Sequence, residues 1–229
     1  MAGQEAALSI HRGFQRTAPE LVKQFDQIPT GNICDAQGRV GALDYRIKPT
    51  TRAANFAGVA LTVHAGPRDN LAPWAAMEIA RPGDVIVIAT GDHTATSVIG
   101  DIYVGMARNA GVTAIVTDGV VRDVAGIEAA GIPVFARGVC PNSPWKNGPG
   151  SVGLALTLGG VLVEAGDLVV GDMDGVVIVP RRRVAAVLEE LKAVRNKEEQ
   201  MDAAVKAGQS VPGWLAETLK TKGVKYLDS

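Results

Sequence analysis

Apolar residues along the first two-thirds of the chain follow two alternating patterns, one typical of buried strands and one typical of amphipathic helices. Short runs rich in valine, isoleucine and alanine predict strands over residues 58–65, 84–89, 112–117 and 133–136. Apolar residues at helical spacing predict helices over 17–25, 30–37, 70–80, 100–110 and 124–130. The first of these helices is expected to begin with a capping box from Thr17 to Glu20. This alternation predicts an α/β domain with a mostly buried sheet.

The pattern changes after Gly138, where a loop rich in proline and glycine, CPNSPWKNGPG, covers residues 140–150. Beyond it, short strands are predicted over 152–157, 161–164, 168–170 and 176–179, with turns between them, so a β-rich second layer is expected. A long amphipathic helix should cover 180–207, and a final helix should cover 212–221. We expect an α/β core over 1–180 and a helical extension over 181–229. The charges of this extension fit either a solvated face or a helix that contacts a neighbouring subunit.

The stretch from residue 100 to residue 123, GDIYVGMARNAGVTAIVTDGVVRD, carries the most informative chemistry. About ten helical residues advance roughly 15 Å, and about five strand residues return roughly 17 Å. Asp101, Arg122 and Asp123 should therefore lie at the same end of one helix–strand unit. Two carboxylates and a guanidinium beside glycine-rich turns suit a metal and oxyanion site, although an exposed turn with ordinary charges would show the same spacing. The helix is expected to bury the stripe Ile102, Val104 or Tyr103, Met106, Ala107 and Ala110.

Composition excludes several classes of partner. The chain has 229 residues, of which 47% are hydrophobic, so it can bury a full core. Its net charge of −1 gives no electrostatic footprint for nucleic acid or a membrane surface. The first residues lack a basic segment followed by an apolar one, and no stretch reaches about 18 uninterrupted apolar residues. These features predict a cytoplasmic protein.

Cysteine and histidine are too scarce for several common kinds of site. Cys34 and Cys140 are far apart in the sequence and predict reduced thiols. With three histidines in the chain, a cysteine nucleophile with a histidine base is disfavoured. A structural zinc site is disfavoured for the same reason, because it needs four cysteine or histidine ligands at short spacings.

Two further motifs have simpler explanations than ligand binding. Residues 148–153 match G-x-G-x-x-G, but a loop precedes them and a strand follows, whereas the dinucleotide-binding motif needs a strand before it and a helix after it. Pro149 also lacks an N–H group for a phosphate. The D-x-D-G sequence at 172–175 could chelate a cation, but it is better explained as a hairpin turn between two strands.

With these residues placed, the chain resembles the family that contains 4-hydroxy-4-methyl-2-oxoglutarate / 4-carboxy-4-hydroxy-2-oxoadipate aldolases and the regulator of ribonuclease activity A (RraA). The resemblance covers residues 29–228. The segments that carry it are CDAQGRVG at 34–41, PGDVIVIA at 82–89, GD at 100–101, DGVVRDV at 118–124, GIPVFARG at 131–138, PGSV from 149 and GDLVVGDMDGVVIVP ending at 180.

The resemblance implies a three-layer fold of the swivelling β/β/α type, assembled as a homotrimer or a dimer of trimers with active sites between subunits. Aldolase members resemble divalent-metal enzymes in which the aspartate of the R-D pair binds Mg²⁺ or Mn²⁺. That position is Asp123, and Arg122 would hold the pyruvate portion of the substrate. Asp101 would belong to the water network around the metal.

The remaining site residues also follow from the resemblance. Gly100, Ile102 and Tyr103 would receive the substrate carboxylate through backbone amides close to Asp101. Lys146 occupies the position of the substrate-side lysine of the family. Glu198 would be the carboxylate supplied by the C-terminal helix of a neighbouring subunit, with Glu199 as the alternative.

This resemblance implies a class II pyruvate aldolase that cleaves a 4-hydroxy-2-oxo diacid and decarboxylates oxaloacetate as a side reaction. Two alternatives stay open: a non-enzymatic regulator that binds a ribonuclease, and an aldolase that uses Lys146 as a Schiff-base nucleophile. The chain departs from the family pattern at Gly126, where an acidic residue is frequent, and at Cys34, where serine or threonine is usual. The departure at Gly126 puts one contact behind the metal site in doubt.

Overall fold

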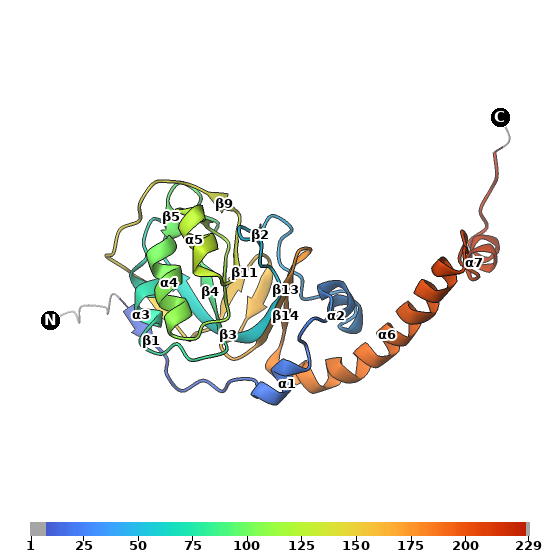
Figure 1. Ribbon diagram of the computed structural model, residues 1–229, viewed down its shortest axis with the longest axis horizontal. Coiled ribbons are helices and arrows are strands. Elements are labelled where there is room, and N and C mark those ends of the chain that lie inside the picture. The colour runs from blue at the N-terminus through green and yellow to red at the C-terminus, as the bar shows by residue number, and fades with distance from the viewer. Residues whose placement is uncertain (1–7, 228–229) are drawn as a thin grey trace.

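A computed structural model describes residues 8–227 and shows an α/β core from which a long C-terminal helix extends (Figure 1). The helices are α1 (Pro19–Lys23), α2 (Thr30–Ala36), α3 (Leu71–Ala76), α4 (Asp101–Asn109), α5 (Val124–Ala130), α6 (Val184–Lys206) and α7 (Leu215–Thr221), with a 3-10 turn at Arg181–Arg183. The strands are β1 (Leu8–Ile10), β2 (Lys48–Pro49), β3 (Phe56–Ala65), β4 (Asp84–Ala89), β5 (Ser97–Ile99), β6 (Ala114–Thr117), β7 (Val120–Val121), β8 (Val134–Ala136), β9 (Gly138–Val139), β10 (Gly150–Val152), β11 (Leu156–Leu158), β12 (Val161–Val163), β13 (Leu168–Asp172) and β14 (Gly175–Val179).

The main sheet is built on four parallel strands in the order β3-β4-β6-β8. β2 pairs antiparallel with β8 at one side, and β10 and β13 pair antiparallel with different parts of β3 at the other. β4 is buried at every position, because its two faces are both covered. Beyond the C-terminal ends of β4, β6 and β8, the chain forms a second, parallel sheet of β5, β7 and β9.

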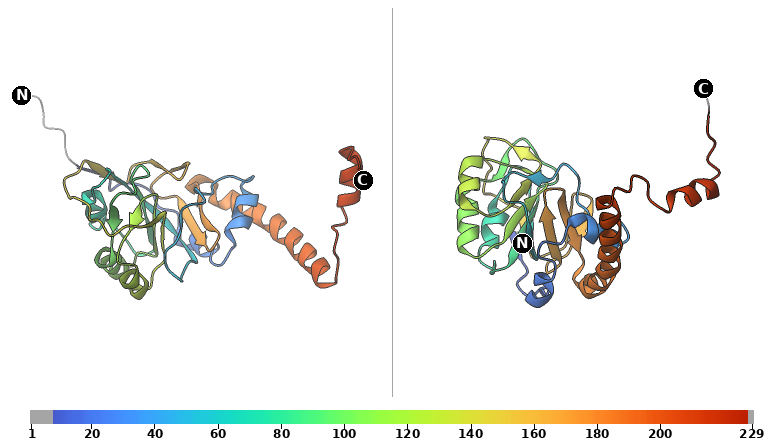
Figure 2. Two further views of the ribbon diagram at one scale, coloured as in Figure 1. Left: turned by 90° about the horizontal axis from the view of Figure 1, so that it is seen from above. Right: turned by 45° about the vertical axis from the view of Figure 1, so that its right-hand side comes forward.

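Three clusters of buried side chains define the layers. Helices α3, α4 and α5 pack on one face of the parallel strands, with Tyr103 and Ile127 fully buried there. The opposite face packs against β11 to β14, and Phe135 lies at this second interface. α1, α2 and α6 then cover the outer face of β13 and β14. The order is therefore helices, parallel sheet, β-rich layer and a further helical cover, which can be followed from left to right in the right-hand view of Figure 2.

The second half of α6 and the whole of α7 extend away from this core (Figures 1 and 2). Val184, Val187 and Leu191 at the start of α6 are buried against the β-rich layer. Farther along, Val205 and Trp214 are exposed. None of the helices within residues 8–227 is both long and apolar enough to cross a membrane.

Most of the predicted elements are confirmed. β4 and α5 have the predicted bounds, and the predicted β-rich second layer is present. The D-x-D-G turn joins two antiparallel strands in which Asp172 pairs with Gly175. The glycine-rich segment from Gly148 leads into strand β10, so the prediction that a strand and not a helix follows this motif is confirmed.

Several predicted boundaries were wrong. Thr17 does not cap α1, which has Ala18 as its N-cap residue, because Pro19 requires an extended residue before it. The Thr17 hydroxyl instead donates to the carbonyl of Gly166 at 2.8 Å. The single strand predicted over 152–157 is two strands in different sheets. Gly153 turns the chain between them with a φ of +77°, where a Cβ would lie 2.3 Å from the carbonyl oxygen of His11.

Three further corrections concern helices. α3 ends at Ala76 and is followed by turns, although the prediction extended it to residue 80. The helix expected from residue 180 begins at Val184, after the 3-10 turn. In α4, Tyr103, Val104 and Ala107 form the buried stripe, whereas the predicted members Ile102 and Met106 are exposed.

Candidate active site

The three-stranded sheet of β5, β7 and β9 brings the predicted site residues together at one edge. β5 and β7 are parallel neighbours, and Ile99 pairs with Val121. Each strand ends one residue before a functional pair, so Gly100–Asp101 and Arg122–Asp123 leave the sheet side by side. Each pair then leads into a helix, α4 or α5. The prediction that these residues lie at one end of the unit is confirmed, and ligands in α/β folds favour this end of the strands.

Arg122 and Asp123 form a partly exposed ion pair. The Arg122 Nε donates to the Asp123 Oδ2 at 3.1 Å, and 36% and 44% of their side-chain surfaces are exposed. The Arg122 Nη1 donates to the hydroxyl of Ser143. Asp123 has a φ of +59°, a left-handed conformation that aspartate tolerates better than most residues. This backbone conformation sets the start of α5, for which Asp123 is the N-cap residue.

Two glycines allow the carboxylates to approach the neighbouring helix. A Cβ on Gly100 would lie 2.5 Å from the Asp123 Oδ2, and a Cβ on Gly126 would lie 2.5 Å from the Asp101 Oδ2. Each aspartate therefore occupies space that a larger residue on the other helix would fill. Gly126 is the position where the family often has an acidic residue, and here the Asp101 side chain lies directly against it.

Asp101 is the first residue of α4, and its carboxylate accepts a hydrogen bond from the first turn of the same helix. Its Oδ1 accepts from the backbone N–H of Ile102 at 2.7 Å. The predicted substrate amide of Ile102 is therefore already hydrogen-bonded in the structure, and the other Asp101 oxygen faces Gly126. The Tyr103 side chain is buried and donates to the carbonyl of Pro73, so only its backbone can meet a ligand.

A cavity of about 250 Å³ contains the predicted constellation. Its lining comprises Asn70, Trp74, Ser97, Val98, Ile99, Gly100, Asp101, Ile102, Tyr103, Arg122, Asp123, Ser143, Pro144 and Lys146. Lys146 reaches it from the 140–150 loop as an exposed residue. The cavity combines a few converging charged groups with an apolar wall, as small-molecule sites commonly do.

Asn70 and Trp74 are lining residues that the sequence did not indicate. Asn70 is buried, and its Nδ2 donates to the carbonyl of Val98 at 3.0 Å. Within residues 8–227, the Asn70 Oδ1 and the Trp74 Nε1 are buried without a hydrogen-bond partner. Buried polar atoms are usually paired. The Asn70 Oδ1, an acceptor, and the Trp74 Nε1, a donor, are therefore free to bind a ligand or water in the wall of this cavity. Asn70 is the N-cap residue of α3 and Trp74 lies within this helix, where the sequence pattern indicates only a helix.

Glu198 lies apart from this cavity within one chain. Its Oε2 accepts from the Nδ2 of Asn32 at 2.5 Å. It lines a separate groove of about 450 Å³ between α2 and α6, together with Asp35 and Lys197. The prediction assigned Glu198 to the site of a neighbouring subunit, and this separation leaves that prediction untested.

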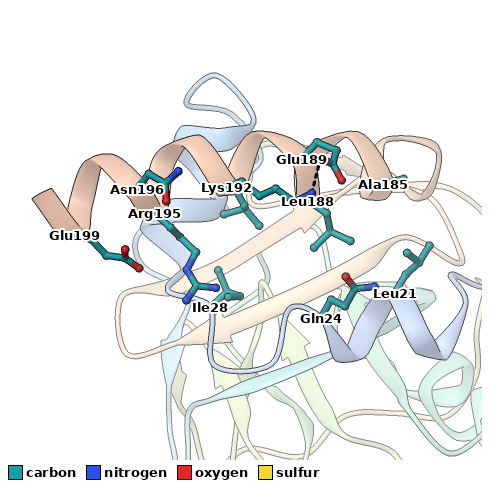
Figure 3. Close-up of a pocket in the computed structure, with 11 residues that line it drawn as sticks. Leu21, Gln24, Ile28, Ala185, Leu188, Glu189, Lys192, Arg195, Asn196 and Glu199 are labelled. Carbon is teal, nitrogen blue, oxygen red and sulfur yellow. Dashed lines mark hydrogen bonds and ion pairs between the residues drawn. The ribbon is translucent and has the colours of Figure 1, made fainter.

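Glu199 lines a different hollow, of about 570 Å³, between α1 and α6 (Figure 3). Apolar side chains, Leu21, Ile28 and Leu188, line it with a few exposed polar groups. Glu189 and Lys192 pair there at 2.6 Å. Arg195 and Glu199, both exposed on α6, line it as well, so this hollow also holds charged groups, but it does not include the Gly100–Asp101 and Arg122–Asp123 pairs. The two glutamates therefore line different grooves beside α6.

Other metal and nucleophile sites find no support in the described chain. In residues 8–227, no group of three histidine, cysteine, aspartate or glutamate side chains converges on a common point. Burial, together with the nearby Asp35 and Asp172, raises the pKa of the Cys34 thiol, which disfavours the reactive thiolate. A metal at the candidate site would have Asp123 as a single carboxylate ligand and would keep water as its other ligands.

Comparison with known proteins gives a consistent result. The RraA-like family model, Aldolase/RraA, matches residues 30–178. A protein of Halalkalibacterium halodurans named "Putative 4-hydroxy-4-methyl-2-oxoglutarate aldolase" is 38% identical over 187 residues, which cover 81% of this chain and 89% of that protein.

Two solved structures are similar to most of the chain. An uncharacterized protein from Pseudomonas syringae pv. tomato has a TM-score of 0.75 and 27% identity, and the match covers 85% of this chain and 96% of that one. Streptomyces coelicolor RraAS2, described as an unusual member of the RNase ES inhibitor RraA protein family, has a TM-score of 0.73 and 27% identity. That match covers 82% of this chain and 99% of the other.

Proposed function

Because the chain belongs to the Aldolase/RraA family, we propose that it is a divalent-metal-dependent pyruvate aldolase. The observation that carries this proposal is the convergence of Asp101, Arg122 and Asp123 in one cavity at the ends of β5 and β7. The proposed substrate is a 4-hydroxy-2-oxo diacid. Cleavage of 4-hydroxy-4-methyl-2-oxoglutarate gives two molecules of pyruvate, and cleavage of 4-carboxy-4-hydroxy-2-oxoadipate gives pyruvate and oxaloacetate.

The donors at this site fit a hard cation such as Mg²⁺ or Mn²⁺. Asp123 offers a partly exposed carboxylate, and one of its oxygens is not used by Arg122. Gly100 allows that carboxylate to lie close to the start of α4, because a Cβ there would be 2.5 Å from its Oδ2. Hard cations bind oxygen ligands and Mg²⁺ usually retains several waters, so one protein carboxylate is sufficient. When bound, the ion would supply Lewis-acid stabilisation of negative charge on a substrate oxygen.

Arg122 can stabilise the negative charge that develops on the substrate during cleavage. Breaking the bond between C3 and C4 leaves the electron pair on the pyruvate half, so negative charge grows on the former keto oxygen. Arg122 donates two hydrogen bonds to side chains in the described part of the chain, and a guanidinium has five N–H groups. The remaining three can bind the keto oxygen and the adjacent carboxylate. One preorganised donor of this kind contributes roughly 3–4 kcal/mol of transition-state stabilisation.

The 4-hydroxyl proton must leave as the carbon–carbon bond breaks. We assign its removal to a water molecule held by Asp101 and by Glu198 of the partner subunit. Asp101 is half-buried at the cavity, and Glu198 is exposed on the extended α6. Glu198 can therefore approach a neighbouring copy in the proposed trimer or dimer of trimers. Decarboxylation of oxaloacetate leaves the same pyruvate half, so it should occur as a side reaction.

Two alternatives receive less support. A regulator that binds a ribonuclease, as the description of the Streptomyces relative suggests for that protein, does not require two aspartates and an arginine in one cavity. A Schiff-base aldolase needs a lysine in apolar surroundings, whereas Lys146 is exposed on the 140–150 loop. Borohydride trapping of pyruvate on the chain would instead favour the Schiff-base mechanism.

Removal of the metal tests the proposal. Treatment with EDTA should abolish pyruvate release, and Mg²⁺ or Mn²⁺ should restore it. The same treatment should leave the melting temperature of the core nearly unchanged, because the single-carboxylate site adds little to folding. Full activity in protein whose metal content is zero by elemental analysis would contradict the proposed cofactor.

Mixing two inactive variants tests whether the site is shared. We expect Glu198→Ala and Asp123→Ala each to be inactive alone. Oligomers refolded from a mixture of the two should recover part of the activity, because one subunit can supply Asp123 while its neighbour supplies Glu198. Glu199→Ala separates the two candidate carboxylates and should stay active if Glu198 is the one supplied, since Glu199 faces a different groove beside α6. Mixtures as inactive as their parents would place the missing carboxylate elsewhere.

A further inference from the structure

Arg122 is held at two points, and the second of them has no role in the mechanism above. Its Nε donates to Asp123, and its Nη1 donates to the hydroxyl of Ser143 on the 140–150 loop. An arginine side chain has several rotatable bonds, and this one is partly exposed. A single contact would leave the guanidinium plane poorly defined, whereas two contacts on different nitrogens fix its orientation.

The backbone around Ser143 is itself anchored on both sides. The carbonyl of Asn142 accepts from the Ser97 backbone N–H at 3.0 Å and from the Ser97 hydroxyl at 2.7 Å. The Asn70 backbone N–H donates to the carbonyl of Trp145 at 2.9 Å, and the Asn147 backbone N–H donates to Asp69 at 2.5 Å. Ser143 therefore lies between two fixed points, which makes its hydroxyl a well-placed acceptor for Arg122.

The two contacts of Arg122 differ in how they respond to a cation. A divalent ion on the Asp123 carboxylate competes with the Arg122 guanidinium for the negative charge of that group. The contact between Arg122 and Asp123 is thereby weakened when the metal site is filled. The Ser143 hydroxyl is neutral, so its hydrogen bond to Arg122 is affected less and keeps the guanidinium directed at the cavity.

We propose that Ser143 is a positioning residue that orients the Arg122 guanidinium toward the 2-oxo acid portion of the substrate. This inference rests on the proposed aldolase function. It predicts that Ser143→Ala lowers kcat/KM for pyruvate release by about tenfold, on the scale of one hydrogen bond to a charged group. Because Ser143 is exposed and binds no metal itself, the melting temperature and the Mn²⁺ dissociation constant should stay unchanged.

Three further variants separate positioning from a general effect on the loop. Ser143→Thr keeps the hydroxyl and should restore kcat/KM to within about threefold of the wild type. Asn147→Ala removes an exposed side chain of the same loop that lies outside the cavity, and it keeps the backbone N–H that donates to Asp69. It should retain nearly full activity. In an Arg122→Lys background, Ser143→Ala should cause no further loss of kcat/KM, because the guanidinium that Ser143 orients is absent.

The measurements are steady-state kinetics and inhibition by oxalate, a planar dicarboxylate that resembles the pyruvate enolate. The inhibition constant should rise in parallel with the loss of kcat/KM in Ser143→Ala. Wild-type kinetics and wild-type oxalate inhibition in Ser143→Ala would overturn the positioning role alone. An equal loss in Asn147→Ala, or an additive loss in the Arg122→Lys background, would overturn it as well. A wild-type chain that releases no pyruvate would overturn this inference together with the proposed function.

Discussion

Replacement of Asp123 by alanine should abolish both metal binding and turnover. Asp123 is the single protein carboxylate that we assign to the metal, and in residues 8–227 no converging group of three potential metal ligands offers a substitute. A Lewis-acid ion contributes several kcal/mol of transition-state stabilisation. Each 1.36 kcal/mol is a factor of ten in rate, so kcat/KM should fall by at least about 10³-fold. Calorimetric titration with Mn²⁺ and a pyruvate-release assay measure the two losses.

Two controls separate this effect from misfolding. Asp123 has a left-handed backbone that alanine adopts less readily, so Asp123→Ala alone could lower stability. Asp123→Asn tolerates that backbone and preserves the size of the side chain, but it removes the charge, and it should lose activity as well. Asp174→Ala removes an exposed carboxylate from the turn between β13 and β14 and should change nothing. Tight Mn²⁺ binding by both Asp123 variants would contradict the assignment.

Replacement of Arg122 by lysine should separate transition-state stabilisation from metal binding. Lysine keeps the positive charge but loses the planar fork that can bind the keto oxygen and the carboxylate together. It also cannot reproduce the paired contacts with Asp123 and Ser143. We expect kcat/KM to fall by at least about 10²-fold, on the scale of one lost oxyanion contact. The Mn²⁺ dissociation constant should stay nearly unchanged.

Arg108→Lys is the matched control for this variant, because Arg108 is exposed at the end of α4 and lies outside the cavity. Its activity should equal that of the wild type. An Arg122→Lys variant with full kcat/KM would show that a point charge is sufficient and that the planar fork has no role. Loss of Mn²⁺ binding in Arg122→Lys would show that Arg122 supports the metal site itself.

Hydrophobic patterns predicted the main strands and helices because their apolar runs are long. β4 has six consecutive buried residues, and α6 shows its apolar stripe over several turns. The strands that place the site, β5, β7 and β9, have two or three residues each, which is too short for any periodicity. The proximity of Asp101 and Asp123 could be predicted because a helix and the strand after it have similar lengths, so the chain comes back to the end of the unit where the helix began.

Other parts of the site depend on tertiary contacts that no local pattern records. Asn70 and Trp74 enter the cavity wall because α3 packs beside β3 and β10, and the sequence indicates only their place in a helix. Ser143 meets Arg122 through a loop that is anchored on residues far away in the chain. The role proposed for Glu198 depends on a second subunit, which no pattern within one chain can place.

Quantification of pyruvate released from 4-hydroxy-4-methyl-2-oxoglutarate by the Mg²⁺- or Mn²⁺-loaded protein tests the central proposal most directly. An aldolase of the proposed type should release two molecules of pyruvate for each molecule of this substrate consumed, and should also release pyruvate from oxaloacetate. The reaction should stop on addition of EDTA. No pyruvate from either compound with metal present would contradict the proposal and would favour the ribonuclease-binding regulator.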